Sequence, residues 1–236
     1  MQKNEEVKYQ LPQHLEGRVP TAAQILKALG DQEYTYEVDR VFVRAVDDER
    51  FVATASPYTA HRFGPPIEMA GEDGTLPFTW VYLAMDGLVA AWESQLVLNN
   101  RGAGSGFHIQ RKAEAKGVLA SVRFKRSLVL WSLGEDHSSR LGIQDPISER
   151  DHETCQHFGL QLREAMLMKP PSERPDGFVY PSHRVKGYPA LALADWAAPD
   201  LFAAAERSVE RFCDTELYAR FRADPMCTAP PELDAR

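Results

Sequence analysis

Residues 80–94 read Trp80-Val-Tyr-Leu-Ala-Met-Asp86-Gly-Leu-Val-Ala-Ala-Trp-Glu93-Ser and carry the pattern of a strand that runs directly into a helix. The alternating apolar residues over 80–85 are typical of a strand. Asp86 is a suitable N-cap. The apolar spacing after it predicts an amphipathic helix that ends near Asn99 and Asn100.

Glu93 is the unusual residue of this expected helix. Residues three and four positions apart share a helical face, and those around Glu93 are all apolar, namely Val89, Ala90, Leu96 and Val97. Burying a carboxylate without a partner costs several kcal/mol. We therefore expect Glu93 to meet a cation, a set of hydrogen-bond donors or a ligand.

Length and composition predict a single domain. The chain has 236 residues, of which 44% are hydrophobic, and this is enough for one substantial core. Strand-like and helix-like segments follow one another without a regular βαβ alternation, so we expect an α+β fold with a mixed, mainly antiparallel sheet flanked by helices. The expected parts are an N-terminal extension with a short helix (1–38), a main domain (39–222) and a flexible C-terminal tail (223–236).

Several further elements are expected from periodicity and capping residues. Strands are expected at 40–46, 117–124, 127–133 and 190–194, and helices at 21–29, from Ser148 and Asp151 through Met166, and at about 200–212. The long helix is expected to bury the stripe Cys155, Phe158, Leu162 and Met166.

Charge and cysteine usage exclude several classes of protein. The formal net charge of −7 disfavours direct nucleic-acid binding, and the basic residues over 123–126 are expected to form an ordinary solvated face. Three widely spaced cysteines without a Cys-x-x-Cys pair argue against a disulfide framework and a zinc ribbon, and fit a reducing compartment. The first residues lack the apolar core of a signal peptide, and no run approaches the roughly 18 apolar residues of a membrane span. We therefore expect a cytoplasmic protein without membrane association.

The seven histidines do not have the spacing of a metal site. His152 and His157 are five positions apart, and no His-Glu-x-x-His pattern occurs. Residues five apart do not share a helical face. We expect no bound metal.

Three polar residues outside the helix are candidates for ligand binding. Arg44 is expected on the same strand face as Phe42 and Val46, where it would either grip an anion with its planar fork or pair with a nearby acid. Arg62 precedes a Gly-Pro turn, and a loop arginine can equally be solvated. Ser182 follows a short strand and a proline, where its hydroxyl would either face a ligand or form a turn.

Taken in order, four short blocks resemble the RES domain family. They are Phe42-Val-Arg44-Ala, Arg62-Phe-Gly-Pro, the stretch from Val81 to Glu93, and Gly177-Phe-Val-Tyr-Pro-Ser182-His-Arg. The family is named for an Arg, a Glu and a Ser, and the matching positions are Arg44 or Arg62, then Glu93 and Ser182, with Tyr82 at the position of the family's active-site tyrosine. The resemblance spans about 40–196. It departs from many relatives at His61 and at Phe63-Gly64, where they have Gly-Gly and Trp-Asn, and in an acidic insertion around 64–78.

The resemblance implies an ADP-ribosyltransferase-like fold and an enzyme that consumes NAD. NAD would be the substrate and not a bound cofactor, and inorganic phosphate is a candidate co-substrate, so the enzyme would be an NAD phosphorylase or glycohydrolase. Arg44 and Arg62 would bind the pyrophosphate, Tyr82 would pack against nicotinamide or ribose, and Ser182 would bond to a ribose or phosphate oxygen. Glu93 would stabilise the oxocarbenium-like charge of the transition state. The expected catalytic residues are Glu93, Tyr82, Arg62 and Ser182.

The resemblance also implies partners. Such proteins are commonly toxins that pair with an Xre-like antitoxin carrying a helix-turn-helix region, and a homodimer within that complex is one expected assembly. Two alternatives to NAD breakdown stay open from the sequence. One is a protein ADP-ribosyltransferase, and the other is a catalytically degenerate RES-like module that only binds a partner.

Overall fold

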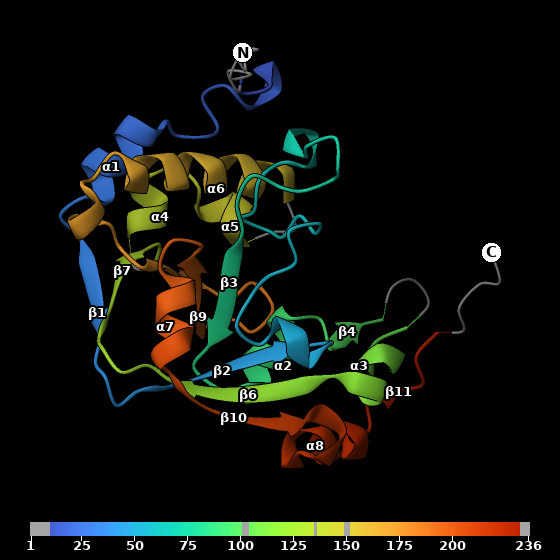
Figure 1. Cartoon of the computed structure of the whole chain (residues 1–236). Helices are drawn as coiled ribbons and strands as arrows, with labels where there is room; N and C mark the ends of the chain where they lie inside the picture. Colours follow the sequence, from blue (N-terminus) through green and yellow to red (C-terminus); the bar gives the residue numbers. More distant parts are fainter. Residues whose placement is uncertain (1–9, 101–103, 135, 149–151, 232–236) are drawn as a thin grey trace.

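A computed structural model describes residues 10–100, 104–134, 136–148 and 152–231. The fold is α+β, as predicted, and is a single domain built on a mixed, largely antiparallel sheet (Figure 1). The large sheet is 8-stranded and has the order β1-β7-β8-β9-β3-β2-β6-β10. Its strands are β1 (Glu33–Tyr36), β2 (Val41–Val46), β3 (Trp80–Ala84), β6 (Val118–Arg123), β7 (Leu128–Ser132), β8 (Gly177–Pro181), β9 (Pro189–Ala194) and β10 (Glu206–Arg211).

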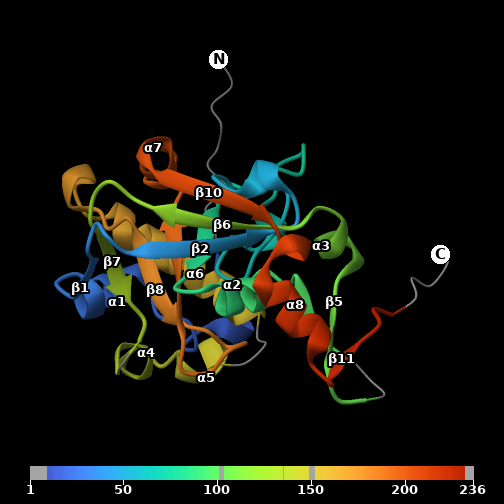
Figure 2. The same ribbon diagram turned by 90° about the horizontal axis from the view of Figure 1, so that it is seen from below.

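A second, 3-stranded sheet lies beside the large one, next to α3 and α8 (Figure 2). It consists of β11 (Cys227–Thr228), β5 (Phe107–Ile109) and β4 (Val97–Asn99). The helices are α1 (Ala22–Leu29), α2 (Gly87–Glu93), α3 (Arg111–Lys116), α4 (His137–Arg140), α5 (Gln144–Ser148), α6 (His152–Leu167), α7 (Ala198–Ala204) and α8 (Glu216–Ala223). None of the helices in the described ranges is both long and apolar enough to cross a membrane.

The large sheet turns a corner between β3 and β2. These strands share one paired position, Val43 with Ala84, whereas β2 and β6 pair over six positions from Val41 to Val46. Figure 1 accordingly shows β1, β7, β9 and β3 upright, with β2, β6 and β10 running across beneath them.

The sheet is covered on both faces, because successive apolar residues of its central strands point to opposite faces and pack into two different cores. Trp80 and Ala84 of β3 belong to the apolar cluster that includes α1 and α6, whereas Val81 and Leu83 belong to a second cluster that includes Phe202 of α7. Successive strand residues point to opposite faces, so β3 is apolar throughout and still serves two cores. The predicted stripe on α6 is confirmed, since Cys155, Phe158, Leu162 and Met166 are all buried.

The N-terminal extension is part of this core. Thr21 and Gln24 form a capping box at the start of α1, which ends before Gly30 as predicted. Ile25 and Leu29 of α1 are fully buried against α6, and Leu15 is buried with them. Next, β1 pairs with β7, so the segment closes one edge of the large sheet.

Two helix predictions are wrong at their C-terminal ends. The helix after Asp86 does not continue to Asn99, because it ends at Glu93 and Gln95 then takes a φ of 63°. Residues 97–99 form β4 instead. The helix expected over 200–212 stops at Ala204, and Glu206–Arg211 is an exposed edge strand paired with β6. Charged side chains are typical of such edges.

The segments at two other predicted boundaries also differ from expectation. Ser148 ends α5 and does not start α6, and its expected capping partner Asp151 lies outside the described residues. The tail expected to be flexible contributes β11, which pairs in parallel with β5. Residues 232–236 of that tail also lie outside the described ranges.

Candidate active site

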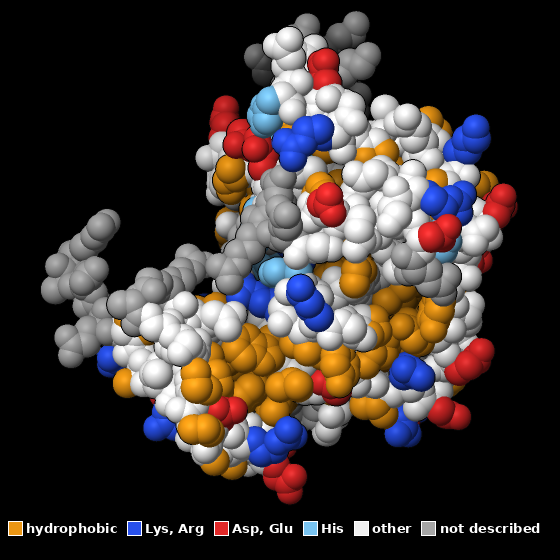
Figure 3. Space-filling model, turned by 180° about the vertical axis from the view of Figure 1, so that it is seen from behind, with side chains coloured by type: hydrophobic (Ala, Val, Ile, Leu, Met, Phe, Trp, Pro, Cys, Tyr) orange, Lys and Arg blue, Asp and Glu red, His pale blue; other side chains and the backbone are white. Residues whose placement is uncertain are grey.

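A cavity of about 440 Å3 opens at the sheet corner. Its wall includes residues from β2, β3, the end of α2, and the loops around 61 and 183. Arg44, Arg62, Tyr82 and Glu93, which are far apart in the sequence, all line it. Figure 3 shows the molecule from behind, where apolar side chains gather in a hollowed band with basic side chains and a histidine at its margin.

Glu93 stands in the last turn of α2, and its side chain is 11% exposed. The Asp86 side chain caps the helix by accepting from Val89 N at 2.9 Å. The expectation that Glu93 meets donors is confirmed, because Ser182 Oγ donates to Oε1 at 2.6 Å and Tyr180 OH donates to Oε2 at 3.2 Å. A carboxylate has about four lone-pair sites, so both oxygens can accept further bonds from the cavity side.

Ser182 supports Glu93 from the protein side of the cavity wall. It is 4% exposed, and its Oγ accepts from Arg184 N at 3.2 Å and from Val185 N at 2.9 Å. The same hydroxyl therefore fixes the carboxylate and caps the turn that follows β8. Of the two alternatives for Ser182, the turn is the one observed, and the ligand-facing hydroxyl stays a prediction.

Tyr180 is the site residue that the sequence reasoning missed. It lies on β8, two positions before Ser182, which follows the strand, and both side chains donate to Glu93. That spacing was the signal that could have found it. Burial, together with the nearby charge of Glu93, raises the pKa of Tyr180 well above its ordinary value. The phenol is therefore a hydrogen-bond donor at neutral pH.

Arg62 contacts His183, whose imidazole lies beside Glu93. Its Nη1 lies 2.5 Å from His183 Nδ1, and because a guanidinium only donates, Nδ1 must accept and carries no proton. The contact of 3.7 Å between the same Nδ1 and Glu93 Oε1 is therefore not a hydrogen bond from the imidazole. The Nη2 of Arg62 donates to the main-chain oxygen of Ile147, which ties the loop to α5.

Arg44 is buried, and its three nitrogens all donate to main-chain carbonyls. Nε bonds to Phe51 O at 2.9 Å, Nη1 to Tyr82 O at 2.6 Å and Nη2 to Thr54 O at 2.5 Å. Arg44 therefore makes neither of the contacts that the sequence left open for it, which were a bidentate bond to an anion and an ion pair with a nearby acid. Hydrogen bonds to charged groups contribute about 1.5–3 kcal/mol each, so Arg44 fastens the 51–54 loop to β3. Burial lowers the pKa of Arg44 to about 10, and the residue stays cationic at neutral pH.

Tyr82 and Trp80 hold the loop that carries Arg62. Phe63 N donates to Tyr82 OH at 3.2 Å, and Trp80 Nε1 donates to Phe63 O at 2.7 Å. Gly159 of α6 packs against the main chain of Phe63, where an added Cβ would lie 2.0 Å from Phe63 O. Burial raises the pKa of Tyr82 above its ordinary value, so its phenol is neutral.

The cavity wall is cationic although the chain is acidic overall. Its Lys and Arg residues outnumber its carboxylates, with Arg44, Arg62, Lys112 and Arg184 against Asp47 and Glu93. Burial, reinforced by Arg44, lowers the pKa of His61, so that lining residue is neutral at pH 7. Among the described residues, no group of three His, Cys, Asp or Glu side chains is placed to hold a metal ion. The site suits an anionic organic molecule.

The predicted residues are therefore brought together, in two layers. Arg44, Arg62, Tyr82 and Glu93 line the cavity, while Ser182 acts on Glu93. Comparison with known proteins gives one family: the RES domain matches residues 37–215. No curated protein and no solved structure matches the chain. The matched segment covers most of the sequence and contains every residue of the site described above, so the chain belongs to the RES domain family.

Proposed function

We propose that the protein consumes NAD by cleaving the bond between nicotinamide and ribose, with phosphate or water as the acceptor. Membership of the RES domain family supports an NAD-related, toxin-like domain. The specific reaction is inferred from the site. NAD is the substrate, and the proposal requires no bound cofactor.

The observation that carries this proposal is the arrangement of Glu93. Its carboxylate lines the cavity with both oxygens fixed by hydroxyl donors. As the C1′–N bond breaks, its electron pair leaves with nicotinamide and positive charge develops on the ribose. A preorganised carboxylate stabilises that charge more in the transition state than in the ground state. An oxygen of phosphate or water then bonds to C1′, and in the reaction with water the bound oxygen loses a proton to solvent.

The cations of the wall favour the anionic half of the substrate. Arg44 and Arg62 are held in place by main-chain carbonyls and His183, so their charge is fixed before NAD binds. We assign the diphosphate to this cationic side and the nicotinamide ribose to the side of Glu93 and Tyr82. Tyr82 presents its ring near those of His61 and Tyr180, with centroids at 5.7 Å and 6.3 Å, which suits packing against a planar base.

The test is NAD turnover by the purified protein, with and without phosphate, with products identified by mass spectrometry. Glu93→Gln keeps the side-chain size and is expected to lower kcat about 100- to 1000-fold, as for loss of one preorganised electrostatic partner. The matched control is Glu210→Gln, on the exposed strand β10, which should leave kcat unchanged. Unchanged NAD with folded wild-type protein under every condition would refute the proposal.

The acceptor decides between related reactions. Nicotinamide and ADP-ribose phosphorylated at the former nicotinamide-bearing carbon, formed only with added phosphate, would show a phosphorylase. ADP-ribose formed without phosphate would show a glycohydrolase. Transfer of labelled ADP-ribose to a macromolecule would instead show a protein ADP-ribosyltransferase. Binding of a partner without any turnover would identify a degenerate module.

We also propose that the protein is the toxin of a toxin–antitoxin pair and acts on cytoplasmic NAD. Its partner would be an Xre-like helix-turn-helix protein, and the complex would contain the toxin as a homodimer. Expression of the wild-type chain should then arrest growth and deplete NAD, and Glu93→Gln should abolish both effects. Growth arrest that persists in Glu93→Gln cells would separate toxicity from catalysis.

A further inference from the structure

We infer that Lys112 is a phosphate-binding residue of the cavity, held by Asp47 until the substrate phosphate replaces that carboxylate. The inference rests on the proposed function and deepens it, because it identifies a residue for the phosphate part of the substrate. It concerns a lysine of α3, outside the four sequence blocks that resemble the family.

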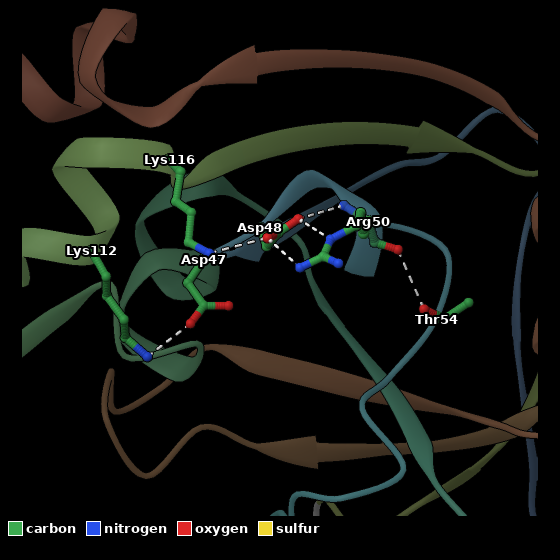
Figure 4. Close-up of polar contacts among 6 residues, drawn as sticks. All are labelled: Asp47, Asp48, Arg50, Thr54, Lys112 and Lys116. Carbon is green, nitrogen blue, oxygen red and sulfur yellow. Dashed lines mark hydrogen bonds and ion pairs between the residues drawn. The ribbon is translucent and has the colours of Figure 1, made fainter.

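The geometry places this pair in the cavity wall. Asp47 follows β2 directly and Lys112 lies in α3, and both line the cavity. Lys112 Nζ bonds to Asp47 Oδ2 at 2.8 Å. Figure 4 shows Lys112 and Lys116 side by side on α3, reaching toward Asp47 and Asp48 respectively.

Lys116 provides a natural comparison one helical turn further on. Its Nζ bonds to Asp48 Oδ2 at 3.1 Å, and Asp48 also accepts from Arg50 Nε at 3.0 Å and from Arg50 N at 3.1 Å. Asp48 is therefore saturated with donors and caps the short helix that begins at Glu49. Of these two lysines, Lys112 is the one in the cavity wall.

The Lys112 ion pair can be exchanged at little cost. The side chains of Lys112 and Asp47 are 54% and 37% exposed, and ion pairs between such groups contribute little to stability. Arg44, in contrast, is buried and donates all three of its nitrogens to main-chain oxygens of the fold. Lys112 is therefore a cation of the wall that can turn toward a ligand without breaking the protein's own main-chain contacts.

A phosphate group is the ligand that best replaces Asp47. A lysine ammonium is a flexible point charge with three donors. A nucleotide diphosphate as a whole, like inorganic phosphate, carries about two negative charges near neutral pH, whereas the carboxylate that it would displace carries one. The other cations of the wall raise the local potential for an anion. Two sources of that phosphate fit the same chemistry, namely the diphosphate of the nucleotide and free inorganic phosphate.

The experiment measures binding without turnover. Isothermal titration calorimetry with ADP-ribose, inorganic phosphate and adenosine is run on wild type, Lys112→Met and Lys116→Met. We expect Lys112→Met to weaken binding of ADP-ribose or of phosphate about 5- to 20-fold. This lies at or below the low end of the roughly 10- to 150-fold of a hydrogen bond to a charged group, because the Lys112 side chain is 54% exposed and must first leave Asp47. Adenosine binding should stay unchanged, and Lys116→Met should resemble wild type. The phosphate-bearing ligand that responds identifies the source.

A mutant cycle adds an independent check. Asp47→Asn releases Lys112 and also removes a negative charge beside the bound anion, so it should tighten binding of the responding ligand. Only the part of this gain that comes from freeing Lys112 depends on the lysine, so the gain should be smaller in the Lys112→Met background. Equal losses in Lys112→Met and Lys116→Met, or no loss in either, would overturn the inference, as would an unchanged gain in the double variant. Because none of these readouts needs NAD cleavage, the inference and the proposed function can fail separately.

Discussion

Replacing Tyr180 by phenylalanine tests whether the site depends on the orientation of Glu93. The substitution removes one hydroxyl and leaves the ring packed against Phe63 and Phe178, at centroid distances of 5.1 Å and 5.7 Å. The lost bond, 3.2 Å long and made to a carboxylate, belongs to the class that contributes about 1.5–3 kcal/mol. Its length places it at the lower end of that range. At about 1.4 kcal/mol per factor of ten, kcat should fall about tenfold.

The assay is release of nicotinamide from NAD, with kcat and KM determined separately. A carboxylate that is misaligned in the transition state lowers kcat, whereas loss of a direct substrate contact would also raise KM. We therefore expect KM to stay within about twofold of wild type. Tyr188→Phe is the matched control, because Tyr188 is 47% exposed and should show neither effect.

A double variant decides whether Tyr180 acts through Glu93. If it does, Tyr180→Phe should cost nothing further once Glu93→Gln has removed the charge. A tenfold loss in both backgrounds would show an independent contribution of Tyr180. A kcat within twofold of wild type for the single variant would refute the reasoning.

Three further outcomes follow from the packing and the charges. Gly159→Ala should lower the free energy of unfolding by about 1–3 kcal/mol and should also lower the activity. The reason is that the new Cβ would lie 2.0 Å from Phe63 O and would push on the Arg62 loop. Chemical denaturation measures the first effect, and kcat measures the second. Arg126→Ala should cost about 2 kcal/mol of stability in thermal melts, because it strips two bonds from buried Asp176 while water partly replaces the exposed arginine. Finally, burial lowers the pKa of His61, so the unfolded state binds its proton first as the pH falls below about 6.5. Stability should therefore decline from pH 7 to pH 5 in urea titrations, and less steeply in His61→Gln.

Most of the strand predictions rested on the short-range alternation of apolar residues. Alternation placed Trp80 and Tyr82 on β3 within one residue of its observed end, and Thr21 as an N-cap with Gly30 as a stop predicted α1. The same reasoning failed for Glu206–Arg211, because that segment has no apolar face and becomes a strand through pairing with β6. Pairing between distant segments is not encoded in local spacing.

The candidate site was predictable in its members and less so in their contacts. An inward carboxylate at Glu93 demanded donors, and the structure supplies two. The sequence could not show that the three nitrogens of Arg44 donate to main-chain carbonyls. Those oxygens belong to a loop and to a strand, and the two come close to Arg44 only because the sheet turns a corner between β3 and β2. The basic stretch expected to be only solvated likewise contains Arg126, which pairs with the buried Asp176.

The packing of α1 on α6 determines which piece of the chain can be studied alone. The family match begins at residue 37, yet Leu15, Ile25 and Leu29 fill the core beside Phe158. A fragment cut to the matched boundaries would uncover the apolar side of α6 and leave β7 without its neighbour β1. The unit of homology is thus smaller than the unit of folding, and shortened versions designed for crystallisation should retain the segment that carries Leu15, Ile25 and Leu29.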